Sequence, residues 1–160
     1  MNRRVKAYVG SALVSALLVL GYATYDRGAL PGMNPTPVDT PFAALSLDNR
    51  GVRVKGTAHY PAQLQMSDGL PGDGPVYVFP LFGPDDTTGK EIRVLVLSHV
   101  MPDPMLGFED RTIEGLVRPS VGRLPQGVRD HLGMLGYRFA DEVLVILDFA
   151  APPAAANPGG

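Results

Sequence analysis

Alternation of hydrophobic and polar residues predicts five β-strands along the chain. Near residue 50, Val52 and Val54 alternate with Arg53 and Lys55, which is the period of two expected of a half-buried strand. The other segments are rich in β-branched and aromatic residues, which favour strands. The five predicted strands are 52–60, 75–82, 91–100, 111–117 and 142–149.

Local features qualify three of these strands. In the segment 91–100, Ile92 and Val94 lie on one side and leucines lie on the other, so we expect both faces to be covered. Pro80 lacks an N–H donor and must lie at a bulge or an edge. Gly115 predicts a bulge or a bend in its strand.

One short amphipathic helix is predicted between the last two strands. Apolar residues at intervals of four, four and three form a single stripe. These residues are Leu124, Val128, Leu132 and Leu135. Pro125 suits the first turn, and Gly136 is a natural stop for the helix.

The order of elements predicts a fold that is mainly β with one short helix. Antiparallel strands that bury apolar faces must either close on themselves or stack. A small, partly open barrel of the oligonucleotide/oligosaccharide-binding (OB) type fits this order best, although its helix usually follows the third strand and here follows the fourth. A β-sandwich, or an open antiparallel sheet with the helix packed on it, is the alternative.

The N-terminal segment predicts a membrane anchor. No charged residue occurs between Lys6 and Asp26, and about 20 apolar residues span the hydrocarbon core of a bilayer. The basic residues Arg3 and Arg4 precede this segment, so the N-terminus is expected to stay in the cytoplasm. The anchor is represented by Ala7, Tyr8, Val14, Leu18, Leu20 and Tyr25.

This topology defines the expected location and organisation of the chain. The protein is predicted to be a signal-anchored, single-pass protein of a bacterial inner membrane, with its C-terminal domain in the periplasm. The competing interpretation is a signal peptide cleaved near Ala23. The predicted parts are an anchor at 1–25, a Pro/Gly-rich spacer at 26–41, an extracytoplasmic β domain at 42–149 and a disordered tail at 150–160.

Composition excludes several classes of function. The formal net charge of −2 gives no electrostatic reason to expect a nucleic acid as partner. The chain contains no cysteine, so disulfides, zinc–thiolate sites and thiol catalysis are excluded. The acidic residues occur mainly as adjacent pairs, whose side chains would point to opposite faces of a strand. No nucleophile–base–acid set is recognisable, so the protein is predicted not to be an enzyme, and no cofactor or metal is predicted.

The histidines and one loop are the remaining candidates for a site. His59, His99 and His131 are weak candidates for binding a cofactor, since their spacing matches no metal motif. The loop between the third and fourth strands carries apolar residues among prolines, which suggests either a lid over the core or a docking surface. The docking residues would be Met101, Met105, Leu106 and Phe108.

Residues 96–117, VLSHVMPDPMLGFEDRTIEGLV, resemble a pattern in the periplasmic heme chaperone family of cytochrome c maturation. That pattern is a strand, a Pro-Asp pair, a hydrophobic turn and a strand ending in glycine. The resemblance implies an anchored OB-type barrel that carries heme through a histidine near a C-terminal tyrosine. Here His131 and Tyr137 are six positions apart, wider than in that family, so no heme-binding residue is transferred.

The succession VRVKGTAHY, VYVFPLF and RVLVLSHV is similar to the core of the Surfeit-locus family of cytochrome oxidase assembly factors. That family has a second membrane span near its C-terminus, for which VLVILDFAAPPAAA is too short. The two resemblances imply a membrane-tethered assembly role. We therefore expect a non-enzymatic interaction module that contacts the lipid bilayer and a membrane or envelope protein; the alternative is a periplasmic small-ligand or heme carrier.

Overall fold

The computed structural model describes residues 35–67, 74–86, 88–103, 105–120 and 124–150, and they form a mainly β domain with one α-helix. The elements in chain order are β1 Val38–Asp39, the 3₁₀ turn η1 Phe42–Ala44, β2 Gly51–His59, the 3₁₀ turn η2 Tyr60–Ala62, β3 Leu64–Met66, β4 Val76–Phe82, β5 Glu91–Ser98, β6 Phe108–Pro119, α2 Gln126–Met134 and β7 Arg138–Asp148. All five predicted strands and the predicted helix are therefore present. The short strands β1 and β3 were not predicted.

Five of the strands close into a barrel. They pair in the order β2-β6-β7-β5-β4, and β4 then pairs with β2 again at Thr57–Phe82 and Ala58–Leu81. The β5–β7 pair is parallel and the other four are antiparallel. The predicted small β-barrel is therefore confirmed, although it is closed rather than partly open, and the alternatives of an open sheet and a sandwich are wrong. Closure provides hydrogen-bond partners for main-chain N–H and C=O groups that would otherwise be exposed at the edges of the sheet.

The barrel interior is filled by aliphatic side chains from all five strands. Val54 of β2, Ile113 of β6 and Ile146 of β7 are fully or almost fully buried there. Leu45, which follows η1, inserts into the same core, and Phe42 packs against it. The segment before β2 is therefore part of the folded domain, because its side chains contribute to the interior of the barrel.

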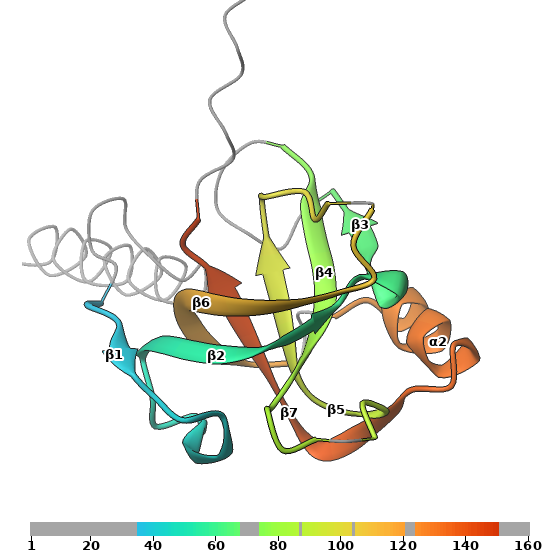
Figure 1. Cartoon of the computed structure of the whole chain (residues 1–160). Coiled ribbons are helices and arrows are strands. Elements are labelled where there is room, and N and C mark those ends of the chain that lie inside the picture. The colour runs from blue at the N-terminus through green and yellow to red at the C-terminus, as the bar shows by residue number, and fades with distance from the viewer. Residues whose placement is uncertain (1–34, 68–73, 87, 104, 121–123, 151–160) are drawn as a thin grey trace, which may run out of the picture. The chain divides into compact units, whose positions relative to one another are not determined.

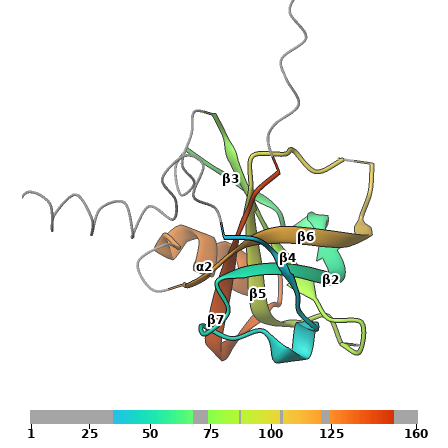
Figure 2. The ribbon, with the colours of Figure 1, turned by 90° about the vertical axis from the view of Figure 1, so that its left-hand side faces the viewer.

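A second core covers the outer face of β4, β5 and β7. Leu95 of β5 and Val145 of β7 point away from the interior and pack with Val128 and Leu132 of α2. Figure 1 shows α2 on one side of the barrel and β1 on the opposite side, and Figure 2 gives the same arrangement after a quarter turn. Strand β5 is therefore covered on both faces, as predicted.

The helix ends as predicted, but its apolar stripe is shorter. Gly136 has a φ of 85°, and its N–H donates to the carbonyl of Gly133. The N–H of Tyr137 donates to the carbonyl of Leu132, which completes a Schellman motif. Leu135, predicted to end the buried stripe, is instead the C-cap residue and is exposed, because the chain turns before that position can face the sheet.

A register shift corrects the prediction for β5. Ile92 pairs with Phe139 of β7, whereas Val94 pairs with Leu144, so the two strands are out of step between these positions. Ile92 consequently packs in the outer core and Val94 in the interior. Strict alternation had placed both residues on one side of the strand.

The ends of the chain are only partly covered by the described residues. Val38 and Asp39 of β1 pair in parallel with Val52 and Arg53 of β2, so the last residues of the predicted spacer extend the sheet. The predicted anchor at 1–25 lies outside the described residues, as does nearly all of the predicted tail. Within the described part of the chain, no helix is long and apolar enough to cross a membrane.

Gly115 lies where β6 passes from one partner to the next. It pairs with Val52 of β2 and with Asp148 of β7. A Cβ atom at Gly115 would lie 2.5 Å from Cγ2 of Ile146 and 2.5 Å from the carbonyl oxygen of Leu147. The glycine therefore allows close approach of the two backbones at this corner of the barrel.

Replacing Gly115 by alanine is predicted to destabilise the domain. The added methyl group must push apart a main chain and a packed side chain, which typically costs ~1–3 kcal/mol. Urea unfolding followed by circular dichroism measures the change in the free energy of unfolding. Gly127→Ala is the matched control, since no atom lies within 4 Å of its Cβ position. Equal stability of the two variants would contradict the close approach at Gly115.

Candidate functional site

The three histidines occupy three different parts of the fold. His59 ends β2, His131 lies in α2, and His99 follows β5, where its Nδ1 lies 3.1 Å from the carbonyl oxygen of Pro75. No group of three or more His, Asp or Glu residues within the described ranges is arranged to hold a metal ion. The histidines therefore have to be considered one at a time, and only His59 lies in an aromatic cluster.

His59 is at the centre of a cluster of rings from four segments. Its ring centroid lies 4.2 Å from that of Phe82, 4.6 Å from that of Phe108 and 6.3 Å from that of Tyr137. Its Nδ1 is 3.4 Å from the hydroxyl oxygen of Tyr137. A Cβ atom at Gly89 would lie 2.7 Å from Cε1 of His59, so the β4–β5 loop also packs against the ring. The cluster thus joins the end of β2 to β4, the start of β6 and the start of β7.

Burial sets the charge state of this cluster. Partial burial lowers the pKa of His59, and the nearby carboxylate of Asp86 opposes that effect only in part. Burial alone would raise the pKa of Asp86, but hydrogen bonds from the N–H groups of Gly89 and Thr88 and from the Thr88 hydroxyl hold it below its usual value. His59 is therefore favoured as a neutral ring beside an ionised Asp86.

Exposed apolar side chains occur in two segments that adjoin the cluster. Phe108, which contacts the His59 ring, is 61% exposed, and Met105 is 89% exposed. On the other side of His59, the end of α2 presents Met134, which is 79% exposed, shortly before Tyr137. We define the docking surface as Met101, Met105, Leu106, Phe108, Met134 and Leu135. The loop residues were predicted from the sequence, but Met134 and Leu135 were not. They could have been recognised as two apolar residues that follow Leu132, the last buried residue of the helix.

The charged groups beside the loop part of this surface are mainly acidic, whereas the exposed Arg138 follows the helix-end part. Asp103 and Asp110 are exposed, and Glu109 is half-buried at the start of β6. The neighbouring Arg111 turns inward: its guanidinium donates to the Tyr60 hydroxyl and lies 5.8 Å from the centroid of the Phe79 ring. The docking surface therefore combines exposed apolar side chains with negative charge.

Tyr60, Glu109 and Arg111 form a polar group at one end of the barrel interior. The Tyr60 hydroxyl donates to the Glu109 carboxylate and accepts from Arg111. Burial and the hydrogen bond to Glu109 raise the pKa of Tyr60 to about 12, against the opposing effect of Arg111. The phenol therefore remains protonated, and the arrangement serves to satisfy buried polar groups rather than to transfer a proton.

Ser98 shows no sign of acting as a nucleophile. Its hydroxyl is fully buried, donates to Oδ2 of Asp148 at 2.7 Å and accepts from the N–H of Val100 at 3.1 Å. The pair links the ends of the parallel strands β5 and β7. The adjacent His99 bonds elsewhere, as the opposite directions of neighbouring strand residues require.

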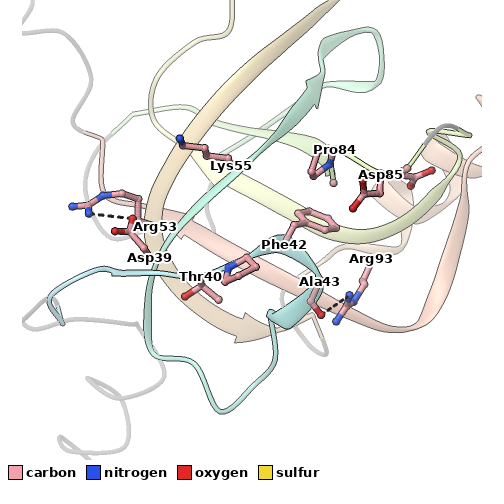
Figure 3. A pocket seen from close by; sticks show the side chains of 12 residues that line it. Asp39, Thr40, Phe42, Ala43, Arg53, Lys55, Pro84, Asp85 and Arg93 are labelled. Carbon is pink, nitrogen blue, oxygen red and sulfur yellow. Dashed lines mark hydrogen bonds and ion pairs between the residues drawn. The ribbon is translucent and has the colours of Figure 1, made fainter.

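A groove of about 660 Å³ lies between the η1 segment and the β4–β5 loop (Figure 3). Phe42 and Pro84 supply apolar walls, and Lys55, Asp85 and Arg93 supply charged groups. This volume falls in the range of ~300–1,000 Å³ that is typical of ligand sites. The groove could not be identified from the sequence, because its residues come from four separate segments.

The environment of His59 predicts a pH-dependent stability. Because its pKa is lower in the folded state than the unfolded value of 6.5, the unfolded state binds the proton more readily. The neutral His59 ring therefore makes its full contribution to the stability of the fold above about pH 6.5, and this contribution is lost as the pH falls toward the folded-state pKa of His59. We expect His59→Phe to reduce the loss of thermal stability between pH 7.5 and pH 5.5, measured by circular dichroism.

Tyr137→Phe provides the control for this prediction. It removes the hydroxyl that faces Nδ1 of His59 but leaves the titrating ring in its apolar surroundings. The wild-type pH dependence should persist in this variant. An unchanged pH dependence in His59→Phe would show that burial of His59 does not couple its protonation to folding.

Comparisons with known proteins assign the chain to no family. No protein-family model, curated protein or solved structure matches it.

Proposed function

We propose that this protein is a non-enzymatic interaction module that binds a partner protein through the docking surface. The observation that carries the proposal is the exposure of Met105, Phe108 and Met134 around the His59 cluster. Exposed apolar patches of this kind mark interaction sites in soluble domains, and methionine and phenylalanine are enriched in interface cores. The packed rings beneath Phe108 reduce the ordering cost of binding.

The charges beside the docking surface favour a protein over a lipid bilayer as its occupant. Exposed Asp103 and Asp110 would be repelled by the anionic lipids that attract peripheral proteins. Arg111, three residues after Phe108, is engaged by Tyr60 and Glu109, so it offers no free charge beside the loop. The partner should therefore present an apolar face flanked by lysine or arginine side chains.

The barrel itself is proposed to be of the OB type. Numbering β2, β4, β5, β6 and β7 as strands one to five gives a ring order of 1-4-5-3-2, which is closed by the parallel pair of strands three and five. OB barrels commonly bind oligonucleotides or oligosaccharides on the face of strands two and three. Here α2 and β3 cover the outer face of β4 and β5, which supports a different use of the barrel.

The predicted anchor supplies the setting for this module. A domain held at the outer face of a bacterial inner membrane by residues 1–25 would meet partners in the same membrane or in the envelope. Tethering raises the effective concentration of such a partner, so a modest docking surface suffices. We therefore propose assembly of a membrane or envelope complex as the role of the domain.

A heme or small-ligand carrier is the second candidate that the sequence suggested. For heme, the geometry offers little, because His59, His99 and His131 lie in separate surroundings. For another small ligand, the groove beside Lys55 is the structural feature that qualifies. The interaction module remains the proposed function, since the docking surface includes the two most exposed large apolar side chains of the described residues, Met105 and Met134.

The absence of cysteine allows a site-specific test. Met105→Cys and Met134→Cys each carry a single thiol, which can be labelled with a photoreactive benzophenone in isolated membranes. Both positions are expected to crosslink to the same protein, and mass spectrometry should place the crosslinks on an apolar face flanked by basic residues. Adding Phe108→Ser should lower the yield from Met134→Cys by about fivefold or more, since truncating a central aromatic typically costs over ~1 kcal/mol.

Asp48→Cys serves as the matched control, because it is exposed but lies between η1 and β2, apart from the docking surface. It should give no crosslink to that protein. Equal crosslinking from Asp48→Cys, labelling of lipid alone, or an undiminished yield with Phe108→Ser would each contradict the proposal. The melting temperature of each variant checks that the fold is retained.

A further inference from the structure

The floor of the groove is a part of β2 that neither neighbouring strand reaches. On this side of β2, Arg53 pairs with Asp39 of β1, and Thr57 pairs with Phe82 of β4. Lys55 lies midway between these two pairs and is paired with neither strand. This edge of β2 thus has a gap of three residues between β1 and β4, with Lys55 at its centre.

The register turns the main chain of Lys55 toward this gap. The Arg53 carbonyl accepts a hydrogen bond from the N–H of Thr40, on the β1 side. Alternate residues of a strand direct their N–H and C=O groups to the same side, so Lys55 directs its own groups there as well. Its cross-strand neighbour on the other side, Thr112 of β6, is therefore in a non-hydrogen-bonded pair.

Pro84 explains why β4 does not fill the gap. Continuing the β2–β4 register by two residues would place Pro84 opposite Lys55. Proline has no N–H to donate to the Lys55 carbonyl, and the chain turns at this point. The sequence therefore ends the ladder at Phe82 and leaves a main-chain donor and acceptor facing the groove.

Two charged side chains of the groove have no partner within the described part of the chain. Lys55 and Asp85 are exposed, and neither side chain makes a hydrogen bond or an ion pair there. The groove's arginines differ, since Arg53 is paired with Asp39 and Glu114, and Arg93 donates to main-chain carbonyls, including that of Leu45 at 2.8 Å. Figure 3 shows Lys55 and Asp85 on different sides of the groove, with Phe42 between them.

We propose that the groove binds a short extended peptide that pairs with the main chain of β2 at Lys55. The peptide's N–H and C=O groups pair with the open part of this edge of β2, its acidic side chain meets Lys55, and its basic side chain meets Asp85. Main-chain pairing of this type is a common mode of peptide recognition. The site shares no residue with the docking surface and adds a second, sequence-selective contact to the module.

The charge pattern determines the selectivity. Exposed ion pairs contribute ~0–1 kcal/mol each, so the two side-chain contacts tune binding and the main-chain hydrogen bonds define it. Side chains two positions apart in an extended peptide lie on the same side, so an Asp-x-Lys or Lys-x-Asp spacing matches two charges along one groove. Which order is preferred reports the direction of the bound peptide relative to β2.

Nuclear magnetic resonance on the full chain in detergent micelles tests the proposal. The probes are the capped peptides acetyl-Ala-Asp-Val-Lys-Ala-amide and acetyl-Ala-Lys-Val-Asp-Ala-amide. At least one is expected to shift the Lys55 amide proton saturably and to slow its hydrogen exchange. The same peptide N-methylated at every residue should bind at least tenfold more weakly, because none of its residues then has an N–H that could pair with β2, whichever direction the peptide takes.

Two pairs of variants separate the groove from nonspecific effects. Lys55→Glu should weaken binding about tenfold, whereas Lys90→Glu, an exposed lysine outside the groove, should leave it unchanged. Ala43→Trp should block the groove, whereas Ala44→Trp, in the same 3₁₀ turn, should not. The proposal is overturned if neither peptide gives a saturable shift at Lys55, if N-methylation has no effect, or if each variant behaves like its control.

Discussion

The structure depends on the seam where β4 closes the barrel against β2. Only two residue pairs form this seam, and a Cβ atom at Gly56 beside it would lie 2.6 Å from the Phe82 carbonyl oxygen. A glycine is required there for the two backbones to approach. Because the seam is so short, the strands diverge on either side of it. The His59 cluster occupies one end, and the groove beside Lys55 occupies the other.

Coverage of the barrel determines which surfaces remain for function. The helix α2 and strand β3 cover the outer face of β4 and β5, so that face serves stability. Within the described residues, no helix or strand covers the outer face of β2 and β6, which carries polar contacts such as Thr57 with Asp110 and Arg53 with Glu114. The docking surface and the groove both flank the seam.

The sequence predicted local features well and tertiary ones poorly, for physical reasons. Alternation located the five barrel strands, and the requirement for a left-handed residue located the helix stop at Gly136. Strands of two or three residues, such as β1, have too few positions to show a period. The register shift after Ile92 arises from pairing with a strand about fifty residues away, which no local pattern encodes. The sites were even more difficult to predict from the sequence, because the rings around His59 come from distant segments that meet only in the folded barrel.

The β4–β5 loop contributes residues to both proposed sites. Asp86 accepts hydrogen bonds from Thr88 and from the N–H of Gly89, which fixes the loop's path. On one side of this turn, Gly89 packs against His59 beneath the docking surface; on the other, Pro84 and Asp85 line the groove. The loop can do both because Gly89, with a φ of 53°, adopts a conformation that other residues rarely adopt. The same short segment therefore ends the β4 ladder, opens the groove and supports the ring beneath Phe108.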